Sequence, residues 1–164
     1  MPGSLRSNGY SLVELLAVLA ILGVLAAMVM PLAKMSAERS RERELKRALW
    51  EIRDALDAYH DARVSGAIPA PAGADPAGPA YPPDLHALTL LQPDLRPAHH
   101  GEFLRFLRRV PADPFTDPAA DPEQSWGLRG YASEATKPAP GPEVYDVYSR
   151  APGTALNGVP LSQW

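Results

Sequence analysis

Glu14 is an isolated carboxylate at the start of a long apolar run. No other side chain between Arg6 and Lys34 is charged at pH 7. Residues 15–30 carry no charged or strongly polar side chain at all. A charge at the centre of a membrane helix costs about 2.5–3.5 kcal/mol, and less near the helix end. The carboxylate either reaches the membrane interface by itself or is compensated by a cation.

A cut between Gly9 and Tyr10 would supply that cation. The new α-amino group would lie four residues before Glu14, close enough to approach it within one helix or between neighbouring subunits. A buried ion pair is weak support for stability but can fix the register of packed helices. The hypothesis is therefore that Tyr10 and Glu14 together set the contact between subunits.

Few other residues carry catalytic chemistry. The chain has no cysteine, which excludes disulfides, thiol catalysis and cysteine-bound metals. No H-E-x-x-H, G-x-S-x-G or phosphate-loop spacing is present. The adjacent pair His99 and His100 could capture a metal, but solvated loop residues are the favoured interpretation. We therefore predict that the protein is not an enzyme and has no cofactor.

Three Asp-Pro pairs recur every fourth residue, at Asp113, Asp117 and Asp121. A calcium loop of the EF-hand kind needs acids at every second position and a glycine, which this spacing does not provide. Asp followed by Pro is typical of turns in which the side chain accepts backbone N–H groups. The pattern favours three such turns over a calcium site.

The apolar run is long enough to cross a membrane. Residues 11–33 number 23, and a helix of about 20 residues spans the roughly 30 Å hydrocarbon core. A signal peptide is the alternative, but its apolar stretch is usually about 7–15 residues and ends at a small-x-small site. Pro31-Leu32-Ala33 is a poor site of that kind. Small residues that could let a second helix approach, or that simply reflect membrane composition, are Ala20, Gly23 and Ala27.

Residues 34–64 continue the helix with an amphipathic pattern. Apolar residues recur at helical spacing, at Leu45, Leu49, Ile52, Leu56 and Tyr59. Together with the apolar run, this predicts one helix of about 50 residues. Trp50 lies off the stripe and is expected to pack at the edge of a head domain.

Residues 65–164 read as a loop-rich head, because 17 of the 19 prolines follow Val64. We expect a loop over 66–83, short helical runs over 85–91 and 101–109, and strands over 126–131 and 144–149. Asp84 is the expected cap of the first run. The net charge of −3 gives no basic excess, so nucleic acid is not an expected partner.

The N-terminus resembles that of type IV prepilins and type II secretion pseudopilins. Those proteins carry a hydrophilic leader ending in Gly, an aromatic first mature residue, usually Phe, and Glu at the fifth mature position. Here the leader is residues 1–9, followed by Tyr10 and Glu14. The resemblance implies that prepilin peptidase cuts after Gly9 and methylates the amino group of Tyr10.

The C-terminal half resembles the major, G-type pseudopilins of type II secretion. The matching stretches are Val110-Pro-Ala-Asp-Pro-Phe115, Trp126-Gly-Leu-Arg-Gly-Tyr131 and Tyr145-Asp-Val-Tyr-Ser149. That family implies an α+β pilin fold, in which a long N-terminal helix packs on a small antiparallel sheet, and a calcium loop after the last strand. This chain has no Asp or Glu in residues 150–164, so its remaining calcium candidates are Asp146, Ser149 and Asn157.

The resemblance implies a division into a leader at 1–9, a filament-core helix at 10–33, its amphipathic continuation at 34–64 and a periplasmic head at 65–164. It implies a single-pass inner-membrane protein with a cytoplasmic N-terminus. The implied function is a structural subunit that assembles with itself and other pseudopilins, on an inner-membrane secretion platform, into a periplasmic pseudopilus. The alternatives are a type IV pilin or minor pilin, or a membrane-tethered binding domain that does not polymerise.

Overall fold

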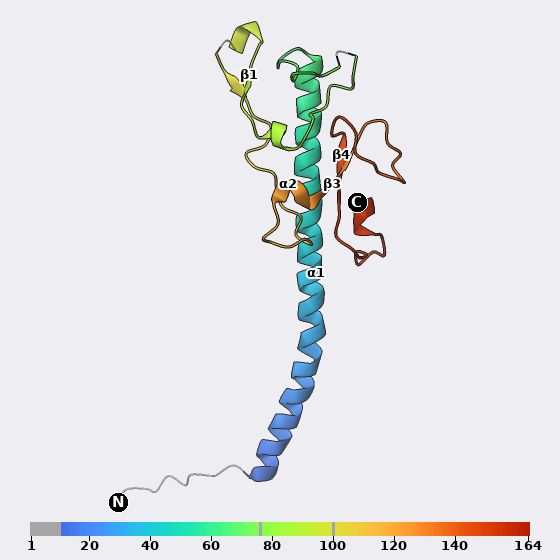
Figure 1. The fold of residues 1–164 in the computed structure, drawn as a ribbon. Helices are drawn as coiled ribbons and strands as arrows, with labels where there is room; N and C mark the ends of the chain where they lie inside the picture. The colour runs from blue at the N-terminus through green and yellow to red at the C-terminus, as the bar shows by residue number, and fades with distance from the viewer. Residues whose placement is uncertain (1–10, 76, 100) are drawn as a thin grey trace, which may run out of the picture. The chain divides into compact units, whose positions relative to one another are not determined.

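The computed structural model describes residues 11–75, 77–99 and 101–164, apart from the side chains of residues 28–31. Its elements are α1 (Leu12–Val64), η1 (His86–Leu88), β1 (Gln92–Pro93), η2 (Pro97–His99), β2 (Phe103–Leu104), α2 (Pro122–Ser125), β3 (Trp126–Arg129), β4 (Asp146–Ser149) and η3 (Leu161–Gln163). One long helix is followed by short strands and turns, so the predicted α+β class is confirmed (Figure 1). The structure divides into two compact units, an N-terminal unit of Met1–Ser40 and a head unit of Arg41–Trp164.

Helix α1 is continuous over 53 residues, which confirms the long helix expected from the sequence. Residues 34–64 contain neither Gly nor Pro, so nothing in this stretch interrupts the backbone hydrogen bonds. The helix ends where Gly66 adopts a left-handed conformation, with φ of 72°. The N–H of Ala67 then donates to the carbonyl of Ala62 at 2.8 Å, as in a common C-terminal helix cap.

The amphipathic stripe of α1 forms one wall of the core of the head unit. Its five large residues are at most 1% exposed, as the helical spacing predicted: Leu45, Leu49, Ile52, Leu56 and Tyr59. Head residues that complete the core include Ile68, Leu88, Leu107, Val110, Trp126, Val147 and Leu161. Fully burying a side chain of this size contributes about 1.5–3 kcal/mol, so this helix face holds the head unit together.

The strands form two separate antiparallel pairs. Strand β3 pairs with β4, with Trp126 opposite Ser149 and Arg129 opposite Asp146, within the two stretches predicted as strands. Strand β1 pairs with β2. The helical run expected over 101–109 is therefore wrong, because Phe103 and Leu104 are in a strand. The N–H groups of Phe106 and Leu107 both donate to the carbonyl of Leu88 instead of forming helical bonds.

The helix expected over 85–91 is reduced to one 3-10 turn, η1. Asp84 accepts a hydrogen bond from the N–H of Ala87 at 2.8 Å, but the N-cap residue of η1 is Leu85, one residue after the predicted position. The turn stops because Leu88 offers its carbonyl to the chain after β2. Long-range backbone pairing has replaced the second helical turn.

All three Asp-Pro sites form the predicted turns. Asp113, Asp117 and Asp121 each accept a hydrogen bond from the N–H two residues later, at 2.8, 2.9 and 3.1 Å respectively. Trp50 lies at the edge of the head, where it lines a surface groove with Asn157, Val159 and Trp164, but its side chain remains 69% exposed.

Candidate functional site

Glu14 lies in the first turn of α1, on the N-terminal unit, and is exposed. The N–H of Leu15 donates to the carbonyl of Ser11 at 3.1 Å, which begins the helical hydrogen bonding at this point. The unpaired N–H groups of a first helical turn favour a negative charge nearby. The negative charge of Glu14 therefore suits its position at the start of the helix, and its carboxylate is accessible to a partner.

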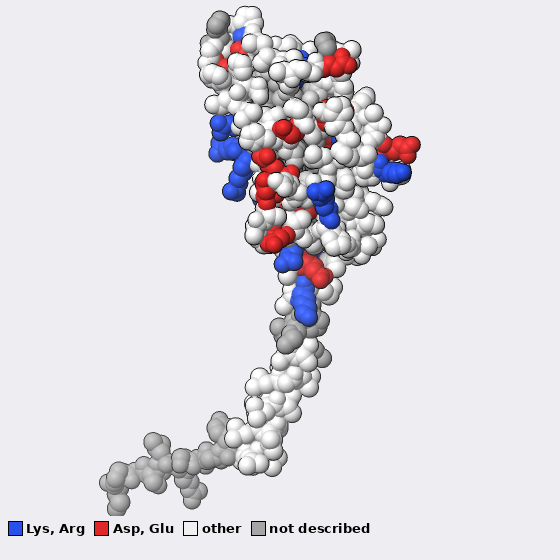
Figure 2. Space-filling view, in the orientation of Figure 1, with Lys and Arg blue, Asp and Glu red and all other residues white. Residues whose placement is uncertain are grey.

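Apolar side chains surround Glu14 along the helix, and they are exposed. Leu12 is 74% exposed and Leu15 is 54% exposed. Among the described residues, α1 is the one helix long and apolar enough to cross a membrane. None of its most apolar 18-residue stretch is buried. Figure 2 shows charged residues gathered on the head unit, while the apolar stretch of α1 is white on the visible face. This surface is suited to lipid or to the helices of other subunits.

The predicted processing site itself, Gly9 and Tyr10, lies outside the described residues. The cut after Gly9 and the methylation of Tyr10 therefore stay predictions. The structure supplies the second half of the motif, an exposed carboxylate on the first turn of an apolar helix.

The three calcium candidates are engaged with other parts of the protein. Oδ1 of Asp146 accepts a hydrogen bond from Nε of Arg53 at 2.7 Å. The Oγ of Ser149 donates to Oδ2 of Asp113 at 2.6 Å, and both of these residues are buried. Oδ1 of Asn157 accepts from the N–H of Val159 at 3.1 Å.

These candidates do not converge on one point. Asp146 and Ser149 are three residues apart on β4, so their side chains leave opposite faces of the strand. A hard dication needs about six to eight oxygens around it. Among the described residues, these three side chains do not surround a common point, and we derive no function from calcium.

Arg53 is a structural residue that the sequence did not single out. Besides Asp146, its guanidinium donates to the carbonyl of Val147 at 3.1 Å and to the carbonyl of Trp164 at 2.7 Å. It thereby ties α1 to β4 and to the C-terminal stretch. The partners lie 93 to 111 residues away in the chain, and no local pattern points to them.

His99 lies beside two acids but in an ion-pair network. Possible ligand atoms of Asp94, His99 and Glu102 lie within 4.8 Å of one another. However, Arg96 donates to both carboxylate oxygens of Asp94 and holds the pKa of that carboxyl at about 2. Nδ1 of His99 lies 2.9 Å from Glu102. The guanidinium of Arg96 is therefore already paired with the buried carboxylate of Asp94. His100 lies outside the described residues.

The comparisons with known proteins address the N-terminus. Residues 4–30 match the family model described as the prokaryotic N-terminal methylation motif. The match includes Gly9, Tyr10 and Glu14, covers 27 of the 164 residues, and indicates a type IV pilin-like N-terminus. Neither the search of curated proteins nor the search of solved structures finds a match.

Proposed function

We propose that this protein is a pseudopilin, a structural subunit that assembles into the periplasmic pseudopilus of a type II secretion system and drives protein export. The observation that carries the proposal is the methylation-motif match at residues 4–30, which overlaps an apolar helix with exposed side chains. The resemblance of the C-terminal half to G-type pseudopilins favours secretion over a pilus. A type IV pilin or minor pilin is the second candidate, because the matched motif belongs to type IV pilin-like proteins generally.

Maturation begins at the membrane. Prepilin peptidase hydrolyses the peptide bond between Gly9 and Tyr10, which releases residues 1–9 and leaves a free amine on Tyr10. Methylation of that amine keeps its positive charge. The helix holds the subunit in the inner membrane as a single pass, with the head unit in the periplasm.

Assembly then pairs Glu14 with the Tyr10 amine of a neighbouring subunit. Away from water the two charges attract strongly, and loss of one partner from a buried pair costs about 3–5 kcal/mol. The exposed apolar side chains of α1 pack against the apolar helices of other subunits. The ion pair selects one axial register, because a shifted helix would leave both charges unpaired in an apolar bundle.

The test is Glu14→Ala in the full chain, expressed with a prepilin peptidase and a secretion platform. We expect normal membrane insertion and a large loss of sheared filaments, because the Tyr10 amine loses its partner. Glu38→Ala is the matched control, since Glu38 is an exposed acid of the same unit beyond the apolar run. Filaments at the wild-type level in Glu14→Ala would refute the pairing.

Export of a reporter protein separates the two candidates. A pseudopilus subunit is needed for release of the secreted protein, and its deletion abolishes that release. If deletion removes surface pili and leaves export intact, the pilin alternative is correct.

A further inference from the structure

The exposed face of α1 in the head unit carries its charges in two separate groups. Exposed residues on this face recur at intervals of four and three positions: Arg43, Arg47, Trp50, Asp54, Asp57 and Asp61. Lys46 is exposed beside them, one position before Arg47. Over this face, the bases therefore come before Trp50 and the acids come after it. All of these residues belong to the head unit.

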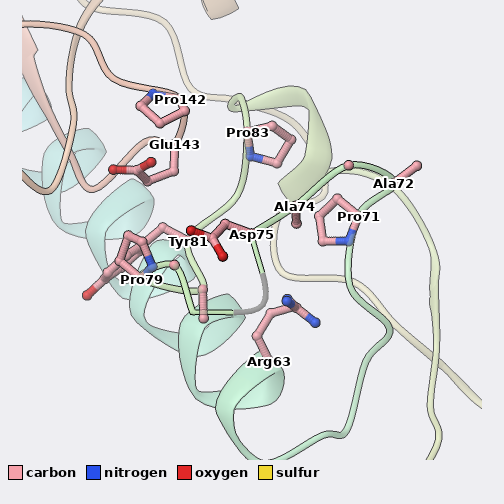
Figure 3. A pocket seen from close by; sticks show the side chains of 13 residues that line it. Arg63, Pro71, Ala72, Ala74, Asp75, Pro79, Tyr81, Pro83, Pro142 and Glu143 are labelled. Carbon is pink, nitrogen blue, oxygen red and sulfur yellow. The ribbon is translucent and has the colours of Figure 1, made fainter.

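Charged residues that would blur this separation point away from the face. Oε1 of Glu42, a neighbour of the bases, accepts a hydrogen bond at 2.6 Å from the backbone of the C-terminal stretch. Arg53, a neighbour of the acids, is bound to β4. Arg63 points from α1 into a hollow that it lines together with Pro71 and Asp75 (Figure 3). The basic group and the acidic group therefore keep their opposite signs at the surface.

Two of the acids have no cation of their own. Asp54 and Asp57 form no ion pair with any described residue of the chain. Arg108 and Arg109 line a groove beside Asp54, but neither is within ion-pair distance of its carboxylate. Asp61 differs, because its Oδ1 lies 3.4 Å from the ring Nδ1 of the preceding histidine. Asp54 and Asp57 are thus the carboxylates that can accept a cation from outside.

Trp50 lies where the bases meet the acids. Its side chain is 69% exposed and lines a surface groove with Trp164. Nζ of Lys46 lies 4.4 Å from the ring centroid of Trp164, so this basic side chain is held at the edge of the same groove. Tryptophan is a preferred anchor of protein interfaces. An exposed tryptophan between two groups of opposite charge fits a protein partner with both signs of charge.

We propose that this face binds a second copy of the chain, parallel to the first and displaced by 11 residues along α1. The inference rests on the proposed function, because copies anchored in one membrane by the same segment point the same way. Parallel copies without displacement would place like charges side by side. Eleven residues are close to three helical turns, so the same face returns after about 16 Å. Arg43 then lies beside Asp54 of the neighbouring copy, and Lys46 beside its Asp57.

This contact repeats along an assembly. Each copy carries both charge groups, so its acids bind one neighbour and its bases bind another. Such a head-to-tail contact does not close on itself and generates a helical filament. A single exposed ion pair contributes little, but several on one face disfavour every register that brings like charges together. The charged face therefore fixes the displacement of the head units.

Disulfide formation between copies tests the displacement. The chain has no cysteine, so Arg43→Cys/Asp54→Cys introduces the one pair. Within one copy the two positions are about 16 Å apart on the helix, beyond the roughly 4.4–6.8 Å between Cα atoms that a disulfide needs. After oxidation of inner membranes that contain the full chain, we expect disulfide-linked dimers and larger oligomers. Arg105→Cys/Lys137→Cys, two exposed positions away from α1, is the matched control for random collision.

Trp50→Cys alone identifies an antiparallel pair, because only in that arrangement does residue 50 meet itself. More disulfide from Trp50→Cys than from Arg43→Cys/Asp54→Cys would overturn the proposal, as would a yield no higher than that of the control. The readout does not depend on filaments. Disulfides without filaments would refute the proposed function alone, and filaments without these disulfides would refute this contact alone.

Charge reversal tests the pairing itself through the yield of sheared filaments. Asp54→Lys/Asp57→Lys and Arg43→Glu/Lys46→Glu should each lower the yield about tenfold or more, because like charges then meet. The chain with all four changes should regain most of the yield, since opposite charges meet again. Arg105→Glu/Lys137→Glu should have no effect.

Anionic lipid head groups are the competing partner of the bases. In that case the loss follows Arg43→Glu/Lys46→Glu alone, and the four additional charges of the combined variant restore nothing. This result, or filaments at the wild-type level in both double reversals, would overturn the proposal.

Discussion

Gly130 and Gly141 bring two backbone segments of the head unit into contact without side chains between them. A Cβ placed on Gly130 would lie 2.8 Å from the backbone N and Cα of Gly141. The N–H of Gly130 donates to the carbonyl of Ala139 at 2.9 Å, which holds the two segments at this spacing. The approach of β3 to the loop before β4 therefore requires glycine.

Gly130→Ala should destabilise the head unit by about 1–3 kcal/mol, because a rigid backbone has to move. Urea unfolding followed by the fluorescence of the buried Trp126 measures the change. Gly127→Ala is the comparison, since its new Cβ would meet the ring of Tyr148, a side chain, and not another stretch of backbone. A smaller loss in Gly130→Ala than in Gly127→Ala would contradict this interpretation.

Residue-level features were predictable when their partners are close in sequence. The turns at Asp113, Asp117 and Asp121 join atoms two residues apart, so composition alone indicates them. The bond from Arg53 to Asp146 spans 93 residues and leaves no local signal. For the same reason the sequence could name the calcium candidates from their donor atoms. It could not show that these atoms are already hydrogen-bonded to other parts of the protein.

At the scale of elements, the face of α1 on which a side chain lies decides how much that side chain contributes to the stability of the fold. Leu49 and Trp50 are adjacent, yet Leu49 is 1% exposed and Trp50 is 69% exposed. Leu49→Ala should cost about 2–5 kcal/mol, because it opens a cavity in the core. Trp50→Ala should change stability by no more than about 1 kcal/mol.

Hydrogen exchange at the amide of Val144 measures both variants, because this N–H donates to the carbonyl of Pro82 at 2.8 Å and Val144 belongs to the buried core. Faster exchange in Leu49→Ala alone is the expected result. If Trp50→Ala accelerates exchange equally, Trp50 has a structural role that its exposure does not indicate.

An ion pair joins η1 to α2. Nδ1 of His86 lies 2.9 Å from Oε1 of Glu123, and this hydrogen bond and its charge raise the pKa of His86 above the usual value of about 6.5. Because the folded-state pKa is raised, the pair stabilises the fold fully below about pH 6.5 and loses this effect as pH rises through the raised pKa.

NMR titration of the His86 ring should give a pKa above 6.5 in the wild type and a lower pKa in Glu123→Gln. Glu134→Gln, which removes an exposed acid elsewhere in the head, should leave the His86 pKa unchanged. An unaltered pKa in Glu123→Gln would show that the contact does not persist in solution.

The elements were predictable where periodicity extends over many turns. The spacing of the stripe from Leu45 to Tyr59 predicted both the helix and its buried face. The run over 101–109 also has near-helical spacing, but it is short, and pairing of β2 with β1 overrides it. The local sequence pattern therefore determines the secondary structure of long elements, whereas contacts with distant parts of the chain determine that of short ones.

At the scale of the whole molecule, the N-terminal unit and the head unit expose and bury different kinds of side chain. The described part of the N-terminal unit is helix with exposed apolar side chains and one carboxylate near its start. The head unit holds the compact core and the hollow around Arg63. A protein that exposes so much apolar surface needs lipid or other subunits to cover it. The hollow depends on the path of a loop that has no periodic pattern, so the sequence did not predict it.

Mass spectrometry of the mature N-terminus tests the central claim most directly. After expression with a prepilin peptidase, the account predicts a chain that begins with N-methylated Tyr10, and no such product from Gly9→Val, whose side chain crowds the scissile bond. A wild-type chain that retains Met1–Gly9 under the same conditions would contradict the account.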